Sequence, residues 1–487
     1  MAPSPEEKQA AVKRKITDSK LFSAGISILV VFVVYLIPTP EALQGDPRAW
    51  NLLAIFAGTI TAFILAPLPM GAVALIAVTL LALSRTLTLV VALSGFANTV
   101  IWLIVGAFLI SRGFIKTGLG ERIAYMFMAK LGKKTLGLAY SLICADLVMA
   151  PAMPSNTARS GGVLFPIVRS LNDAYNSRAE DGTQKKMASF LSYTMFQTDH
   201  ILCAMFMTAM AANPLAVSIA GGMGIEITWA SWFIAALVPG VICLLLIPLL
   251  LYKIYPPEIK ETPEAVEMAK KHLTELGPLK AVEKKMIGVF ILLLFLWIFG
   301  PNLFRIDATL TALIGLSIML ITNVISFEDV KSEKGAWDTL IWFAVLVMMA
   351  GQLNTLGIIG WFSDSVASSV AGVNWVAAFV IVAIAYYYSH YFFASATAHV
   401  SAMYGAMLVV AVAVGTPPML AALILAYFSN LHMGITHYGT GPAPVYFGPG
   451  YVKLGTWWGL AFFPLSFIHL IVWLGVGSLW WKMLGLW

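Results

Sequence analysis

APAMPSNTARSGGVLF (residues 150–165) and HYFFASATAHVSAMYG (residues 390–405) are the two stretches that decide the fold of this chain. Each carries a short polar tripeptide inside apolar sequence, Ser155-Asn156-Thr157 in the first and Ser395-Ala396-Thr397 in the second. The tripeptides lie 240 positions apart, from 155 to 395, and other residues repeat at the same offset. These pairs are Gly95 and Gly335, Thr99 and Thr339, Ile101 and Ile341, Trp102 and Trp342, Val105 and Val345, and Ala158 and Ala398. The chain is therefore predicted to be a duplication.

The composition indicates a membrane protein. Of the 487 residues, 60% are hydrophobic and only 11% are charged, which is too little polar surface to cover a water-soluble fold of this size. Several apolar runs reach the roughly 18–20 residues that one helical span needs, whereas barrel strands would be shorter and would alternate with period two. The net charge of +6 does not indicate a nucleic-acid partner, because the basic residues lie in loops between apolar runs. The three cysteines all lie in apolar stretches, where core packing is expected rather than a disulfide framework.

The predicted fold class is an all-α polytopic membrane protein with about eleven transmembrane helices and two re-entrant helical hairpins in two inverted repeats. The basic N-terminus is expected in the cytoplasm. A bacterial inner membrane is favoured over a plastid envelope, because the N-terminus does not resemble a transit peptide. The predicted segments are 1–21 (cytoplasmic), 22–48 (first transmembrane helix), 49–253 (first repeat, hairpin 136–171), 254–285 (cytoplasmic linker) and 286–487 (second repeat, hairpin 373–411).

The two hairpins are predicted from flanking charge and from helix breakers. The segment 136–171 has basic residues on both sides, so it cannot cross the membrane once. Prolines and glycines interrupt it around its tripeptide, and such a break is tolerated only where protein or a wet cavity surrounds it. The long apolar segment 187–221 is likewise expected to be unwound near Asn213, which precedes a proline.

Each hairpin tip is expected to present the N-terminus of its second half-helix. Such an end has unpaired backbone N–H groups and about half a positive charge, and Ser, Asn and Thr are the residues that cap it. Two tips meeting from opposite sides would hold the two carboxylates of a small dicarboxylate. The alternative is ordinary hydrogen bonding between helices by small residues. The residues that the sequence assigns to substrate binding are Ser155, Asn156, Thr157, Ser395, Ala396, Thr397, Thr440, Gly441, Pro442 and Asn213.

Arg159 and His399 each follow a tip threonine by two residues. A cation inside an apolar hairpin is costly and usually functional, so the two are assigned to charge compensation near the anion. The alternative for Arg159 is a structural partner for a backbone carbonyl or for Asp199. The segment around Thr440 is the most irregular part of the second half, since its glycines and prolines cannot continue a helix; a simple kink is the alternative to a part in the site.

The sequence shows no Walker A loop and no Cys/His metal spacing, so no cofactor or resident metal is predicted. A membrane-embedded enzyme would need a nucleophile–base pair or a metal set. Asp199 and His200 are the one candidate pair, and adjacent side chains diverge on a helix. A pore is a further alternative, but hairpins that occlude the path favour alternating access.

Three stretches of the sequence together resemble the divalent anion:sodium symporter family. They are Pro154-Ser155-Asn156-Thr157-Ala158-Arg159, the second tripeptide with His399, and the segment from His437 to Pro444. The resemblance covers nearly the whole chain. The most similar branches are the 2-oxoglutarate/malate translocators and the citrate/succinate antiporters. The resemblance implies a homodimer, a scaffold and a transport domain in each protomer, an elevator-type movement and a di- or tricarboxylate substrate. Sodium-coupled members carry Ser-Asn-Thr at both tips.

Ala396 departs from that family pattern and removes one side-chain oxygen, which puts one sodium site in doubt. The leading hypothesis is therefore a sodium-independent exchanger of dicarboxylates. A sodium-coupled di- or tricarboxylate symporter is the alternative.

Overall fold

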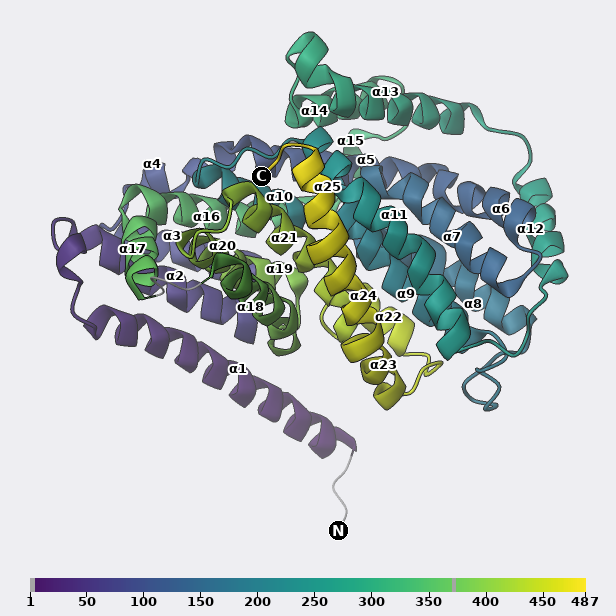
Figure 1. Cartoon of the computed structure of the whole chain (residues 1–487), viewed down its shortest axis with the longest axis horizontal. Coiled ribbons are helices and arrows are strands. Elements are labelled where there is room, and N and C mark those ends of the chain that lie inside the picture. Colours follow the sequence, from purple (N-terminus) through teal and green to yellow (C-terminus); the bar gives the residue numbers. More distant parts are fainter. Residues whose placement is uncertain (1–4, 370–373) are drawn as a thin grey trace. The chain divides into compact units, whose positions relative to one another are not determined.

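The structure is a computed structural model that describes residues 5–369 and 374–487 (Figure 1). The predicted start of the second hairpin, residue 373, lies outside the described residues. Within them the chain is helical, apart from loops and one isolated bridge between Lys134 and Glu261. Eleven helical segments of this part are long and apolar enough to cross a membrane. These findings confirm an all-α polytopic membrane protein.

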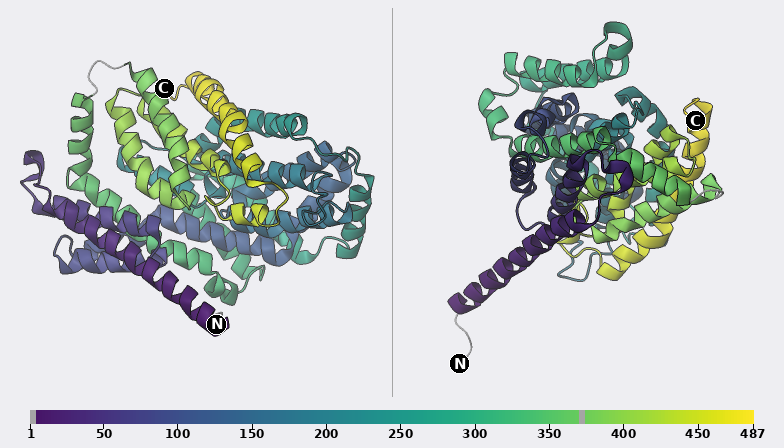
Figure 2. Two further views of the ribbon diagram at one scale, coloured as in Figure 1. Left: turned by 90° about the horizontal axis from the view of Figure 1, so that it is seen from below. Right: turned by 90° about the vertical axis from the view of Figure 1, so that its left-hand side faces the viewer.

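Contacts divide the chain into two compact units, Met1–Ile101 with Trp337–Gly372 and Trp102–Ala336 with Val373–Trp487. In the first unit, Figure 2 shows α1 as one uninterrupted rod that includes most of the predicted segment 1–21 as well as the first span. Its helices are α1 (Pro5–Leu36), α2 (Pro47–Leu65), α3 (Met70–Leu83), α4 (Leu89–Ala92), the larger part of α16 (Lys334–Thr355) and α17 (Ile358–Ser369), with the 3-10 turns η1 (Glu41–Leu43) and η2 (Ser94–Ala97).

The second unit holds both tripeptides. Its elements from the first half are α5 (Thr99–Thr117), α6 (Leu119–Leu131), α7 (Thr135–Met149), η3 (Ala150–Ala152), the π-helical segment η4 (Thr157–Leu164), α8 (Phe165–Ala174), α9 (Ala188–Met205), η5 (Met207–Ala209), α10 (Ala212–Gly222) and α11 (Trp229–Ile254). α7 contacts η4, and α8 continues η4, so the chain reverses between α7 and η4 as the predicted hairpin requires.

The linker between the halves forms a helix of its own. α12 (Pro263–Leu276) packs against α6, where Tyr125 stacks on His272 with ring centroids 4.6 Å apart. Glu283, at the start of the next helix, pairs with Arg122 of α6 at 2.7 Å, and both side chains are buried. The helices that follow are α13 (Ala281–Phe304), α14 (Ala308–Ile321) and α15 (Phe327–Ser332), and α13 and α14 lie side by side in both figures.

The second half repeats the element order of the first. Its elements in the second unit are α18 (Trp375–Tyr388), η6 (Ser389–Phe392), α19 (Ala396–His399), the π-helical η7 (Val400–Tyr404), α20 (Gly405–Ala413), α21 (Pro418–Leu431), η8 (His432–Ile435), α22 (Pro442–Phe447), α23 (Leu454–Leu460), η9 (Ala461–Leu465), α24 (Ser466–Leu470), η10 (Ile471–Gly477) and α25 (Ser478–Met483). α18 contacts α20, which gives the second hairpin. Each half thus contains a hairpin and then a broken helix, α9–η5–α10 or α21–η8–α22.

The eleven candidate spans include hairpin arms, which the sequence analysis counts as re-entrant segments and not as crossings. Three of them, 135–152, 375–392 and 396–413, are hairpin arms. Conversely, α3 and α14 are shorter apolar helices, and the predicted span 187–221 is not among the eleven. The reason is that α9 carries several polar residues, Gln197, Thr198, Asp199 and His200, which lower its hydropathy and lie buried against protein.

Candidate functional site

The first tripeptide forms the turn of the first hairpin. α7 ends at Met149, and Pro151 and Pro154 follow, which cannot continue a helix because they lack a backbone N–H. The Oγ of Ser155 then accepts a hydrogen bond from the backbone N–H of Ala158 at 3.2 Å. Ser155 therefore caps the second arm, and its own O–H remains available as a donor to a ligand.

The second tripeptide repeats this arrangement. Ser395 is the N-cap of α19, with extended backbone (φ −148°, ψ 128°), and its Oγ accepts from the N–H of Ala398 at 3.4 Å. Both tip serines are half-buried, and the residue after each of them, Asn156 or Ala396, is buried. Thr157 is exposed and Thr397 is half-buried. The prediction that both tips cap a half-helix is confirmed.

One loop, residues 436–441, contacts both hairpins. At one end of it, the Nδ2 of Asn156 donates to the Oγ1 of Thr440 at 3.1 Å. Gly441 lies so close to Thr157 that a Cβ added to it would be 1.9 Å from the threonine Oγ1, so this position requires glycine. At the other end, a Cβ on Gly439 would be 2.2 Å from the Nε2 of His390 in the second hairpin.

This geometry brings together four of the residues that the sequence assigned to substrate binding: Asn156, Thr157, Thr440 and Gly441. Ser395 and Thr397 belong to the hairpin that meets the same loop through His390. The exposed or half-buried groups at the tips are hydroxyls and backbone N–H groups at half-helix N-termini, which are neutral donors suited to an anion.

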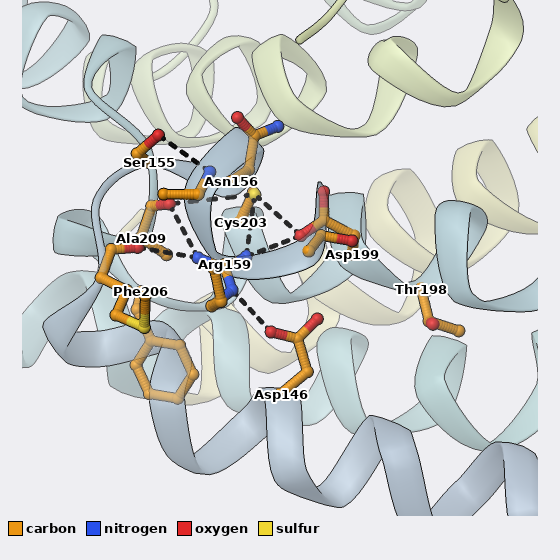
Figure 3. A network of polar contacts seen from close by, with 12 residues as sticks. Asp146, Ser155, Asn156, Arg159, Thr198, Asp199, Cys203, Phe206 and Ala209 are labelled. Atoms are coloured by element: carbon orange, nitrogen blue, oxygen red, sulfur yellow. Dashed lines mark hydrogen bonds and ion pairs between the residues drawn. The ribbon is translucent and has the colours of Figure 1, made fainter. Parts of the chain in front are cut away.

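Arg159 lies between two carboxylates, as Figure 3 shows. Its Nε donates to the Oδ1 of Asp146 at 2.6 Å and its Nη2 to the Oδ1 of Asp199 at 2.8 Å, and all three side chains are fully buried. The remaining N–H groups go to Met153 O (2.9 Å), Ala209 O (3.1 Å) and Cys203 Sγ (3.4 Å). All five guanidinium donors are therefore in use.

Because its donors are used, Arg159 does not offer a hydrogen bond to a substrate in this conformation. These contacts match the structural alternative that the sequence analysis left open, in which Arg159 pairs with Asp199 and with backbone carbonyls. Its predicted part in charge compensation remains a prediction, and it depends on the charge of Asp146 and Asp199. The sequence analysis missed Asp146, thirteen residues before Arg159 and hidden in an apolar helix.

Asn213 holds the broken helix α9 together. Its Nδ2 donates to Cys203 O at 2.8 Å and to Phe206 O at 3.1 Å, carbonyls that the end of α9 leaves without helical partners. Its Oδ1 accepts from the Nδ2 of Asn430 on α21 at 2.7 Å. The α-helix is interrupted over residues 206–211, which include the 3-10 turn η5, so the predicted break near Asn213 is confirmed. Both amide donors are used, and a direct part in substrate binding remains a prediction.

Each broken helix packs on the hairpin of the other half. Pro442, another predicted site residue, is buried at the first position of α22, and α22 contacts η4 of the first hairpin. There the Oγ of Ser160 and the hydroxyl of Tyr446 are 3.0 Å apart. Correspondingly, α10 contacts η7 of the second hairpin. The sequence analysis missed Ser160, Tyr446 and Asn430, because partners so far apart in the chain leave no local pattern.

His399 is buried next to the second tip. Its Nε2 lies 2.8 Å from the Oγ of Ser389 at the end of the first arm of the hairpin. It also contacts two other buried histidines, His390 and His432, with ring centroids 5.5 and 4.5 Å away. Its predicted part in charge compensation remains untested. The histidine cluster was not found from the sequence, since its members come from three separate elements.

Comparison with known proteins gives consistent results. Residues 18–487 match the model of the sodium:sulfate symporter transmembrane region. The chain is 55% identical to YflS of Bacillus subtilis (strain 168), whose name marks malate transport as its proposed activity, over 99% of this chain and 98% of YflS. It is 49% identical to the chloroplast dicarboxylate transporter 1 of Spinacia oleracea, over 95% of this chain and 81% of the relative.

A more distant relative, the L-tartrate/succinate antiporter of Shigella sonnei, is 35% identical over 91% of this chain and 95% of its own length. The structure of MtrF from Neisseria gonorrhoeae aligns with 82% of this chain and 84% of its own chain, at a TM-score of 0.55 and 15% sequence identity. At that identity the likeness concerns the fold alone.

Proposed function

Because the chain belongs to the sodium:sulfate symporter family, the divalent anion:sodium symporters, we propose that it exchanges dicarboxylates of the 2-oxoglutarate, malate and succinate class across the cell membrane. The chain is a multi-pass transporter and not an enzyme, since the family and the relatives are transporters. The alternative enzyme pair is also unsupported locally, because Asp199 is bonded to Arg159. The observation that carries the proposal is the pair of capped hairpin tips on one loop.

The tips suit a dianion on physical grounds. Ser155 and Thr157 at one half-helix end, and Ser395 and Thr397 at the other, offer hydroxyl donors beside unpaired backbone N–H groups. Each helix end contributes about half a positive charge, so the two ends together offset about half of the charge of a dicarboxylate. Backbone N–H groups and hydroxyls at helix N-termini are a recurrent arrangement for binding anions.

Exchange without sodium is the finer part of the proposal. It is supported by Ala396, which replaces a side-chain oxygen at the second tip, and by the name of the L-tartrate/succinate antiporter. A homodimer and an elevator-type movement of the transport domain complete it. The competing function, sodium-coupled symport of di- or tricarboxylates, is favoured by the name of the matched family model.

Counterflow in proteoliposomes tests the proposal. Vesicles loaded with malate are expected to take up labelled 2-oxoglutarate faster than empty vesicles, equally with sodium or with choline outside. Uptake into empty vesicles that requires an inward sodium gradient would support the symporter instead. Absence of any dicarboxylate uptake, while the protein remains folded by size-exclusion chromatography, would contradict both.

A further inference from the structure

Three histidines from separate elements meet beside the second hairpin tip. They are His390 in η6, His399 in α19 and His432 in η8, and each is fully buried. One ring nitrogen of each lies within 4.8 Å of one from both others. Five of the six ring nitrogens have no hydrogen-bond partner among the described residues. Buried polar groups are almost always paired, so several unpaired ring nitrogens this close together indicate that a ligand binds between them.

The sixth nitrogen shows how one ring is oriented. The Oγ of Ser389 donates to Tyr386 O at 2.8 Å, so the same oxygen accepts the proton on Nε2 of His399 at 2.8 Å. His399 is thereby fixed as the tautomer whose Nδ1 carries a free lone pair. A histidine that ligates a metal typically donates its other N–H to such an oxygen, which sets the tautomer and the ring orientation.

We propose that His390, His399 and His432 form a binding site for a divalent transition-metal ion of the zinc class. Three imidazoles with an open fourth position are an established ligand set for Zn²⁺ and Co²⁺. The cluster holds no carboxylate, which argues against Ca²⁺ or Mg²⁺, ions that require oxygen ligands. The surrounding rings of Tyr386 and Phe393, 4.6 and 4.7 Å from that of His399, give the site a largely apolar wall.

Binding requires a small rearrangement of the rings. His390 and His432 are stacked, with centroids 4.0 Å apart and planes 19° from parallel, so their lone pairs do not converge on one point. In a tetrahedral site with bonds of about 2.0–2.1 Å, the ligand nitrogens lie about 3.3 Å apart. Aiming the three lone pairs at one ion therefore requires the rings to turn about their Cβ–Cγ bonds, and the His390 ring has to do so beside the backbone of Gly439.

The ion would connect two parts of the second half. His390 and His399 belong to the two arms of the hairpin, whereas His432 follows α21. A bound ion would thus fix the second tip to the loop that continues from η8 to Thr440. We expect binding to raise the thermal stability of the protein, because the ion binds the folded state and not the unfolded chain.

Cobalt provides the direct test. Purified full-length protein, stripped with a chelator, is titrated with Co²⁺ while its visible spectrum is followed, and Zn²⁺ is then added in competition. The expected result is an intense tetrahedral spectrum that saturates at one Co²⁺ per chain and is displaced by Zn²⁺. The substitutions H390A and H432A should each weaken binding by about 100-fold or more. A weak octahedral spectrum, or saturation without displacement by Zn²⁺, would overturn the proposal.

Two controls separate the cluster from other histidines. His469 is equally buried but outside the cluster, and His272 is a surface histidine of the linker helix; H469A and H272A should leave Co²⁺ binding unchanged. If H272A lost the Co²⁺ spectrum and H432A kept it, the ion would bind at His272 and not at the histidine cluster. If the cluster variants do not fold, X-ray absorption of zinc-loaded wild-type protein decides: three imidazole ligands support the site, and one or none refutes it.

Discussion

Replacing Asp199 by asparagine tests how charge is balanced around Arg159. Two carboxylates face one guanidinium, so the three groups carry one net negative charge if both acids are ionised. All three are fully buried, and the Oδ2 atoms of Asp146 and Asp199 have no hydrogen-bond partner among the described residues. The other polar groups around them are Cys203, Tyr446, Asn156 and His200. We therefore predict that removing one of the two carboxylate charges costs little, whereas removing the guanidinium costs much more.

The magnitudes follow from the charge count. Asp199→Asn keeps an oxygen toward Arg159 and leaves one cation with one anion, so a loss of at most about 1 kcal/mol is expected. Arg159→Gln removes the cation and leaves two buried acids without it, which should cost about 3–5 kcal/mol. The double variant Arg159→Gln/Asp199→Asn removes one of these acids and should recover part of that loss, so the two substitutions are coupled rather than additive.

Thermal unfolding of the purified protein in detergent measures these differences in stability. A thiol-reactive dye can report the unfolding, because Cys203 and Cys243 are buried and become accessible when the protein unfolds. A loss of about 1 kcal/mol lowers the melting temperature by at most about 2–4 °C. Arg159→Gln should therefore lower the melting temperature by about 6–20 °C, and Asp199→Asn by less than about 4 °C. The reasoning is refuted if Asp199→Asn is as destabilising as Arg159→Gln, or if the double variant is less stable than Arg159→Gln alone.

Three further predictions concern other parts of the second unit. Thr157→Ala and Thr397→Ala should each lower counterflow by about 10-fold while leaving the melting temperature unchanged, since each removes one hydrogen bond of about 1.5 kcal/mol to a charged ligand; wild-type exchange in both would remove the tips from the site. Gly441→Ala should lower counterflow more than an alanine at the open Gly459, because its Cβ would be 1.9 Å from the Oγ1 of Thr157 and nothing lies near a Cβ at Gly459; equal activity would contradict the close contact. The Lys116 ammonium, which donates to Asp329 at 2.5 Å, holds the pKa of that carboxyl well below its usual range. The stabilisation that this ion pair contributes is present above a pH of about 4 and is lost as the pH falls further. The melting temperature should therefore fall more steeply between pH 6 and pH 3 for wild type than for Asp329→Asn; an equal pH dependence in both would exclude that contribution.

Local features of the sequence were sufficient to predict the two hairpins. Pro151 and Pro154, two prolines three residues apart next to a polar tripeptide, predict a helix break. A serine after such a break finds the N–H groups of the next turn within reach, as Ser155 does with Ala158. The repeat at an offset of 240 positions then identified Ser395 as the equivalent residue. The break before Asn213 was predictable for the same reason.

The polar interior was not predictable in this way. Asp146 looks like an isolated acid in an apolar helix, and only the fold brings it within 2.6 Å of Arg159. Asn430 and His432 lie in apolar α21 and at its end, where hydropathy gives no indication of their partners, Asn213 and the other histidines. The polar residues of α9 face protein rather than lipid, so hydropathy alone does not identify this helix as a span. In each case the missing information is a tertiary contact, made within one hairpin by Asp146 and Arg159 and between distant segments by Asn430 and His432.

The contacts around loop 436–441 bear on how such a site could move. Asn156 of the first hairpin bonds to Thr440, and Gly439, one residue earlier, abuts His390 of the second hairpin. The broken helices cross over, α22 onto η4 and α10 onto η7, and Asn213 bonds to Asn430 between them. A mechanism that opened the site by rocking one half of the chain against the other would have to break all of these buried contacts in every cycle, and each unpaired buried group would cost about 1–3 kcal/mol. Moving both hairpins as one body breaks none of them, which supports the elevator-type movement in the proposed exchange.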